Sequence, residues 1–221
     1  MGPKTILKPI HRKFLEAVNK EKYLTSNYYW TGGTVLSEFF LHHRESEDID
    51  LFIEKKEVHL PAIKSFIEKF SRKNAINKIA HSTYLGLESF LLTNQNLVLK
   101  VDFNYYPFPR IEIGKKWKNL AVDSLLDIAV NKIHTVSMRP RTRDFVDLYF
   151  ILNKFNLSVG ELIKLAKAKF DWHIDPIQLG LKMSQVVTKK DYPKMIVSLD
   201  PRKMEDFFLN LAKSLEKNIF E

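Results

Sequence analysis

Apolar residues along the chain follow helical spacing near the start and strand-like spacing further on. Ile10, Phe14, Leu15 and Val18 recur at the intervals of an amphipathic surface helix, which predicts a helix over residues 9–24. The elements predicted next are a strand over 28–30, a helix over 34–42 that starts at Thr34 as N-cap, a strand over 48–53 and a helix over 61–71.

Residues 76–106 have the apolar runs and turn residues of a strand meander. The predicted strands are 76–81, 87–92 and 97–105, with a turn at 93–96 between the last two. From residue 122 to 155 the spacing becomes helical, interrupted by a loop at 138–142, and the last third is predicted to be helical throughout. The expected fold class is α+β, with a mixed sheet flanked by helices over 1–118 and a helical half over 119–221.

Charge is distributed unevenly along this chain of 221 residues, which carries a net charge of +9. Residues 32–60 contain three Lys/Arg and seven Asp/Glu, whereas residues 61–120 contain ten and four. An acidic segment inside a basic chain suits an enzyme that acts on polyanions, although lysines used for solubility give the same excess. The absence of cysteine excludes disulfides, zinc–thiolate sites and a cysteine nucleophile. Without an apolar run of membrane-spanning or signal-peptide length, the chain is expected to be cytoplasmic and to have no membrane partner.

The acidic segment contains the strongest candidate chemistry. Asp48 and Asp50 belong to one predicted strand, so their side chains point to the same side. Two such carboxylates repel each other unless a cation lies between them, and their hard oxygen atoms suit Mg²⁺. The upstream turn Gly32-Gly33-Thr34 lets backbone approach a phosphate closely. This order of motifs predicts metal-dependent chemistry on a nucleoside triphosphate.

A third acid, Asp102, lies in the otherwise apolar strand 97–105. Burying an isolated carboxylate costs several kcal/mol or forces its protonation, so Asp102 is a candidate metal ligand or general base. The alternative is that strand alternation places Asp102 on a hydrated face, as it does Lys100.

Further charged candidates lie in the helical half. Lys132, in a mostly apolar helix, could neutralise charge on a leaving group, but solvent exposure is the commoner fate of a lysine. Asp144 and Asp147 share a helix face, although acids are also favoured in a first helical turn. Arg139, Arg141 and Arg143 are expected in the preceding loop, either holding phosphates or forming a mobile basic loop. His42-His43 is interpreted as a helix end.

Taken together, these residues resemble the AbiEii/AbiGii-type nucleotidyltransferase toxin family, which includes the MenT toxins. The matching segments span roughly residues 30–152. They are Gly32-Gly33-Thr34, His43-Arg44-x-Ser46-x-Asp48-Ile49-Asp50-Leu51-Phe52, Asp127 to Lys132, and Arg143-Asp144-Phe-Val-Asp147-Leu-Tyr.

The resemblance implies that the mixed sheet is nucleotidyltransferase-like and that the protein is a nucleotidyltransferase of a toxin–antitoxin system. It also implies a nucleoside triphosphate as substrate, RNA (tRNA above all) as acceptor and a cognate antitoxin as possible partner. Asp48 and Asp50 would hold Mg²⁺ or Mn²⁺, and Gly32, Gly33, Thr34, Arg44, Ser46 and Arg143 would bind the nucleotide. Asp102, Lys132, Asp144 and Asp147 complete the expected catalytic set. Two alternatives stay open: nucleotidyl or phosphoryl transfer to a protein side chain, and non-catalytic binding of nucleotide or RNA.

Overall fold

Alternation of buried and partly exposed residues along β2 (Asp48–Ile53) defines the two faces of the central sheet. In this computed structural model, which describes residues 5–217, Ile49, Leu51 and Ile53 face the core, while Asp48 and Asp50 point to the other side. The neighbouring strand β5 (Leu97–Tyr105) runs parallel to β2, with Asp50 opposite Asp102 in the register. The acids and the hydrophobic core therefore lie on opposite faces of one sheet.

Seven strands form this sheet in the order β3-β4-β5-β2-β1-β7-β6. The β2–β5 and β1–β7 pairs are parallel and the remaining pairs are antiparallel, so the sheet is mixed as expected. The other strands are β1 (Tyr29–Thr31), β3 (Lys78–Tyr84), β4 (Leu87–Asn94), β6 (Lys116–Trp117) and β7 (Leu120–Val122).

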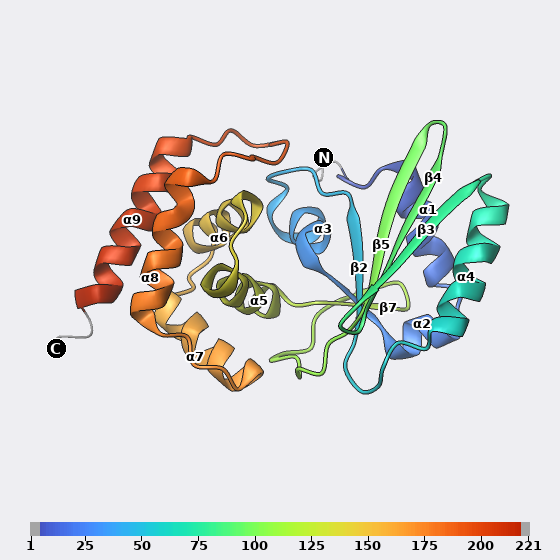
Figure 1. The fold of residues 1–221 in the computed structure, drawn as a ribbon, viewed down its shortest axis with the longest axis horizontal. Coiled ribbons are helices and arrows are strands. Elements are labelled where there is room, and N and C mark those ends of the chain that lie inside the picture. The colour runs from blue at the N-terminus through green and yellow to red at the C-terminus, as the bar shows by residue number, and fades with distance from the viewer. Residues whose placement is uncertain (1–4, 218–221) are drawn as a thin grey trace. The chain divides into compact units, whose positions relative to one another are not determined.

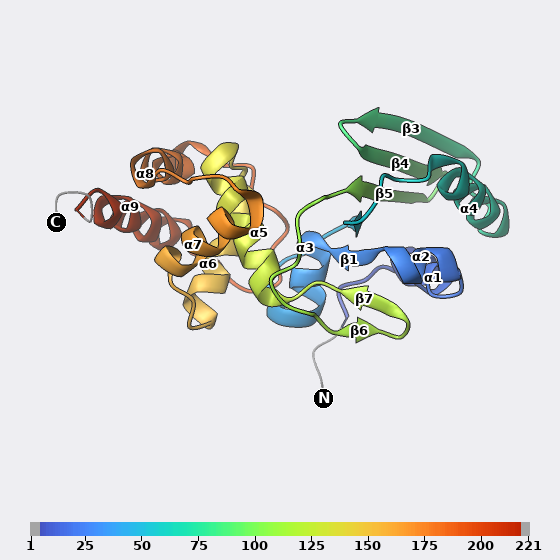
Figure 2. The same cartoon turned by 90° about the horizontal axis from the view of Figure 1, so that it is seen from below.

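Two amphipathic helices, α1 (Pro9–Val18) and α4 (Leu60–Lys73), lie side by side in the same part of the molecule (Figure 2). The ring of Phe14 on α1 packs edge-on against Phe66 and Phe70 of α4, at centroid distances of 5.5 and 5.0 Å. The helix predicted over residues 9–24 is interrupted after Val18, and a second helix, α2, spans Lys22–Asn27. The buried side chain of Asn19 explains the interruption, because its oxygen accepts hydrogen bonds from the backbone of Asn119 and Leu120.

The residues divide into two compact units, shown together in Figure 1. Among the described residues, unit 1 comprises 5–40, 46–109 and 113–124 and contains the sheet, and unit 2 comprises 41–45, 110–112 and 125–217. Strand β7 lies beyond the expected boundary between residues 118 and 119, but it pairs with β1 and belongs to unit 1.

Unit 2 is helical. Its helices are α5 (Leu125–Met138), α6 (Thr142–Lys154), α7 (Val159–Phe170), α8 (Pro176–Ser184) and α9 (Pro201–Lys217), with a 3₁₀ turn at Gln185–Thr188. Ser158 and Glu161 form the capping box that starts α7, and the ring of Phe145 on α6 packs against Phe208 on α9. The last third is not helical throughout, since residues 189–200 form no helix. Within residues 5–217, no helix is both long and apolar enough to cross a membrane.

Candidate active site

Three carboxylates share the open face of the sheet in unit 1. Asp48 and Asp50 are two residues apart on β2, and the parallel register places Asp102 of β5 opposite Asp50. Asp102 is only 7% exposed, and one of its carboxylate oxygens accepts a 2.6 Å hydrogen bond from the hydroxyl of Ser89 on β4. Asp102 thus lies on the face of the other two acids, but it is buried there rather than freely hydrated.

Lys100 supplies positive charge to this group of acids. Its Nζ lies 2.7 Å from Oδ2 of Asp102 and 3.6 Å from Oδ2 of Asp48. Partial burial lowers the pKa of Lys100, but the hydrogen bond to Asp102 and the charges of Asp102, Asp48 and Asp50 outweigh it and raise the pKa above its ordinary value. The ammonium group is therefore charged at neutral pH, and it compensates part of the acidic charge.

The glycine turn after β1 lies directly against the acids. Gly32 has φ of +83°, and a β-carbon added there would be 2.1 Å from Oδ2 of Asp50. Any other residue would strain the backbone and collide with that carboxylate. Gly32 therefore lets the start of α3 (Gly32–Val35) approach β2, which places backbone amides of the turn near Asp50.

Thr34 connects this turn to the start of β2. Thr34 is 1% exposed, its hydroxyl donates a hydrogen bond to the backbone carbonyl of Asp48, and it lies 2.9 Å from the hydroxyl of Ser46. The expected N-cap role of Thr34 is wrong, because α3 starts at Gly32 with Thr31 at the N-cap position. Helix α3 continues as a π-helix over Leu36–Leu41, and His42, with φ of +53°, follows its end.

The donor atoms of this face suit a divalent cation. Asp48, Asp50 and Asp102 offer hard carboxylate oxygens, and the position of Lys100 shows that they hold a positive charge. Among residues 5–217, no three His, Cys, Asp or Glu side chains form a group that would hold a metal ion by themselves. The residues therefore fit Mg²⁺ or Mn²⁺ bound by one or two carboxylates together with oxygens of the substrate, rather than an all-protein metal cage.

Unit 2 contains a second charged cluster centred on Asp147, which is completely buried. Arg44 donates two hydrogen bonds to this carboxylate, at 2.6 and 2.8 Å, and Nε2 of His43 lies 2.8 Å from it. Burial alone would raise the pKa of Asp147, but the charges of Lys132 and Arg44 and the hydrogen bonds from Arg44 and His43 hold it well below its ordinary value.

Lys132 joins this cluster rather than pointing into solvent. Its Nζ lies 2.6 Å from Asp147 and 2.8 Å from Asp144, and its side chain is 12% exposed. Asp144 also accepts hydrogen bonds from the backbone and side chain of Arg141 at the start of α6. Arg143 lies inside the first turn of α6 instead of in the preceding loop, which is limited to residues 139–141.

Sequence reasoning did not assign two residues that the structure includes in these clusters. His43, which belongs to a matching segment but was interpreted as part of a helix end and given no role, is buried against Asp147, 104 positions away in the chain. No sequence signal marks that contact. Lys100, in contrast, was detectable, since strand alternation places it on the face of Asp102.

Comparison with known proteins identifies the family. A family described as nucleotidyl transferase AbiEii toxin, type IV toxin–antitoxin system, matches residues 13–215. The chain belongs to the AbiEii nucleotidyltransferase toxin family. The resemblance drawn from the motifs is confirmed, and this AbiEii protein is a nucleotidyltransferase.

Three proteins illustrate what this AbiEii protein is similar to. The protein aq_aa25 of Aquifex aeolicus is 30% identical over 204 residues, which cover 88% of this chain and 91% of the relative. JHP933 of Helicobacter pylori has a similar structure, with a TM-score of 0.57, 19% identity and coverage of 95% of this chain and 91% of the other. MenT4, a nucleotidyltransferase toxin of Mycobacterium tuberculosis, gives 0.56 at 13% identity, covering 93% and 83%. These similarities confirm the expected nucleotidyltransferase-like α+β fold.

Proposed function

We propose that this AbiEii toxin transfers a nucleoside monophosphate from a nucleoside triphosphate to an RNA acceptor, with tRNA as the acceptor class, and that it depends on Mg²⁺ or Mn²⁺. The observation that carries the proposal is the grouping of Asp48, Asp50 and Asp102 on one sheet face, directly beside the Gly32 turn. Carboxylates next to a close-approaching glycine backbone form the combination needed to hold a metal and a triphosphate together.

Asp48 and Asp50 would hold the metal. A bound ion would neutralise charge on the triphosphate. The backbone of Gly32 and Gly33 would contact phosphate oxygens, while the hydroxyl of Thr34, beside Ser46, keeps the turn attached to the backbone of Asp48 on β2.

Asp102 is proposed to accept the proton of the attacking acceptor hydroxyl or to serve as a further ligand. Its hydrogen bonds with Ser89 and Lys100 hold the carboxylate in one orientation. Lys100 also places a positive charge on the face where the triphosphate would lie, and such a charge stabilises negative charge that develops on oxygen during transfer.

The residues of unit 2 enter the proposal through the family resemblance. Lys132 is proposed to stabilise the departing pyrophosphate, with Arg44 and Arg143 as nucleotide-binding residues and Asp144 and Asp147 as acids of the same set. Their contacts support a positioning role first, because Asp144 and Asp147 hold Lys132 from two sides. The toxin–antitoxin family also supports a cognate antitoxin as a protein partner.

The decisive experiment measures incorporation of each of the four α-labelled nucleoside triphosphates into total tRNA. We expect label in the RNA with Mg²⁺ or Mn²⁺, none with EDTA, and none with Asp48→Asn/Asp50→Asn, whose folding is checked by circular dichroism. Label in protein would instead establish transfer to a side chain. No label in any acceptor from folded protein would leave a nucleotide- or RNA-binding module and refute the proposal.

A further inference from the structure

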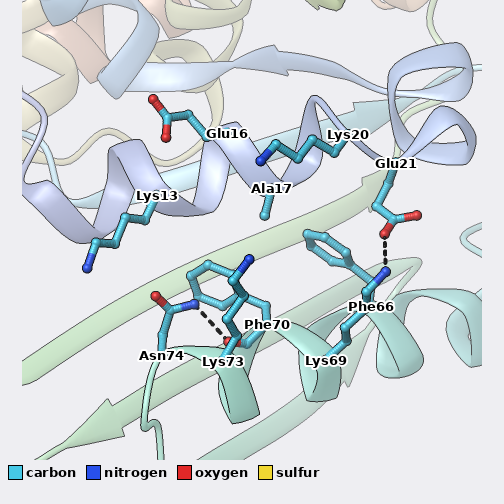
Figure 3. A pocket seen from close by; sticks show the side chains of 10 residues that line it. All are labelled: Lys13, Glu16, Ala17, Lys20, Glu21, Phe66, Lys69, Phe70, Lys73 and Asn74. Carbon is cyan, nitrogen blue, oxygen red and sulfur yellow. Dashed lines mark hydrogen bonds and ion pairs between the residues drawn. The ribbon is translucent and has the colours of Figure 1, made fainter.

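A groove between α1 and α4 is lined by four lysines and two glutamates, so its charge is positive on balance (Figure 3). Its volume is about 400 Å³, and its floor includes the rings of Phe66 and Phe70. Lys13 lies on α1, Lys20 lies just beyond the end of that helix, and Lys69 and Lys73 lie on α4. The carboxylates of Glu16 and Glu21 line the groove as well. Lys69 pairs with Glu21 at 2.9 Å, whereas Lys13, Lys20 and Lys73 form no ion pair with any residue between 5 and 217.

The groove does not end with the two helices. A second hollow of about 360 Å³ shares Lys13, Lys73 and Asn74 with the first. A third, also of about 360 Å³, shares Ala75 and Leu97 with the second. Side-chain amides line this third part, from Asn77, Asn94, Gln95 and Asn96. Neighbouring hollows share lining residues, and we call the three together the α1–α4 channel.

One end of the channel reaches the end of the sheet that carries the acids. Leu97, which lines two of the hollows, precedes Lys100 by three residues on β5, or about 10 Å of extended chain. Lys100 is opposite Asp48 in the register. On the α1 side, Lys8 forms an ion pair with Glu47, so the start of α1 also lies beside the residue that precedes Asp48.

We infer that the α1–α4 channel binds the phosphodiester backbone of the acceptor RNA as the strand leads away from the acids; this inference rests on the proposed function. Lys13, Lys20 and Lys73 offer positive charges that pair with no described acid, and lysines of this kind contact the phosphates of a nucleic-acid strand. Amides suit the same ligand, because they hydrogen bond to phosphate, sugar and base edges alike. An acidic protein segment would satisfy the lysines but would leave the amide-lined part without a corresponding role.

The test measures binding of fluorescein-labelled total tRNA over a salt series, in EDTA and without nucleotide, so that it does not depend on catalysis. The channel variant is Lys13→Gln/Lys20→Gln/Lys73→Gln. The control Lys55→Gln/Lys64→Gln/Lys116→Gln removes the same charge from exposed lysines that do not line the channel and that pair with no described residue. Both variants are first checked for unchanged thermal unfolding.

We expect the slope of log K against log salt to become shallower by about 2 in the channel variant, since three lost phosphate contacts contribute about 0.7 each for a single strand. The control should keep the wild-type slope. Equal slopes in the two triple variants would overturn the inference. A wild-type protein that does not bind tRNA even at low salt would also overturn it.

A kinetic arm separates this result from the proposed function. Where transfer is detected, the channel variant should raise KM for tRNA without changing kcat, and should leave transfer to an oligonucleotide too short to reach the channel unaffected. If label enters no RNA at all, the proposed function fails while the salt slopes still decide whether the channel binds RNA.

Discussion

Gly32 and Asp50 approach so closely that no side chain fits between them: a β-carbon on Gly32 would lie 2.1 Å from Oδ2 and 2.9 Å from Cγ of Asp50. Gly32 and Asp50 are 18 positions apart in the chain. The carboxylate of Asp50, a proposed metal ligand, can occupy its position only because glycine has no side chain. The positive φ of Gly32 adds a second requirement for glycine, because L-residues rarely adopt it.

Gly32→Ala should therefore abolish nucleotidyl transfer by displacing Asp50. We expect a loss of stability of roughly 1–2 kcal/mol from the left-handed backbone conformation alone, so the protein should still fold. The measurement is the rate of label transfer together with the melting temperature.

The control is Gly160→Ala, in α7, where an added β-carbon meets no atom within 4 Å. Alanine is favoured over glycine inside a helix, so this variant should be fully active and slightly more stable, by up to about 1 kcal/mol. Wild-type transfer by Gly32→Ala would show that the position of Asp50 does not matter for the reaction.

Lys100→Met should strengthen metal binding. The ammonium group of Lys100 contacts both Asp102 and Asp48 and competes with a metal ion for these carboxylates. Without the ammonium group the carboxylates repel each other more strongly, and a bound metal ion relieves that repulsion. Because the Lys100 side chain is 40% exposed, solvent screening limits the expected gain to roughly tenfold in affinity. Isothermal titration calorimetry with Mn²⁺, in the absence of nucleotide, measures this affinity. Weaker binding in Lys100→Met would mean instead that Lys100 orients the carboxylates for the metal.

Local patterns were sufficient to predict the sheet elements that carry the acids. The bounds of β2 and β5 agree with those predicted, because β2 alternates strictly and β5 is a mostly apolar run that follows clear turn residues. Strands β6 and β7 were missed, since two- and three-residue strands contain too few residues to show a period. The predicted strand over 76–81 is shifted to Lys78–Tyr84, because every residue of β3 is exposed and no buried face marks its ends.

Long-range contacts explain what the sequence could not show about the charged residues. The pairing of Arg44 with Asp147 does not follow from local spacing, because the two residues are 103 positions apart. The burial of Lys132 depends on its contacts with Asp144 and Asp147 on the next helix, which the pattern of its own helix does not show. The same limit applies to Asn19, whose contacts with residues 119 and 120 interrupt the first predicted helix.

Thr34 should act through Asp48 and not through direct contact with nucleotide, because its hydroxyl is buried and already hydrogen bonded. Thr34→Val keeps the shape of the side chain but leaves the Asp48 carbonyl without its donor, which costs about 1–3 kcal/mol of stability. We expect a lower kcat with little change in KM for the triphosphate. Thr34→Ser restores the hydroxyl and should restore kcat. A rise in KM alone would instead indicate that Thr34 contacts the substrate.

Asp147→Asn should destabilise unit 2 in a pH-dependent way. The substitution leaves Arg44 and Lys132 buried around a neutral group, for which we expect a loss of about 3–5 kcal/mol at neutral pH. The control Asp171→Asn changes an exposed acid of the same unit and should be nearly neutral.

The pH dependence follows from the direction of the pKa shift of Asp147. Its folded-state pKa lies well below the unfolded value of 3.8, so the stabilisation is complete above that pH and is lost progressively as the pH falls toward the folded-state pKa. Urea unfolding, followed by circular dichroism from pH 7 downward, should show the difference between wild type and Asp147→Asn shrinking only below about pH 4. A difference that stays constant through acid pH would mean that lost packing, rather than the carboxylate charge, accounts for the effect.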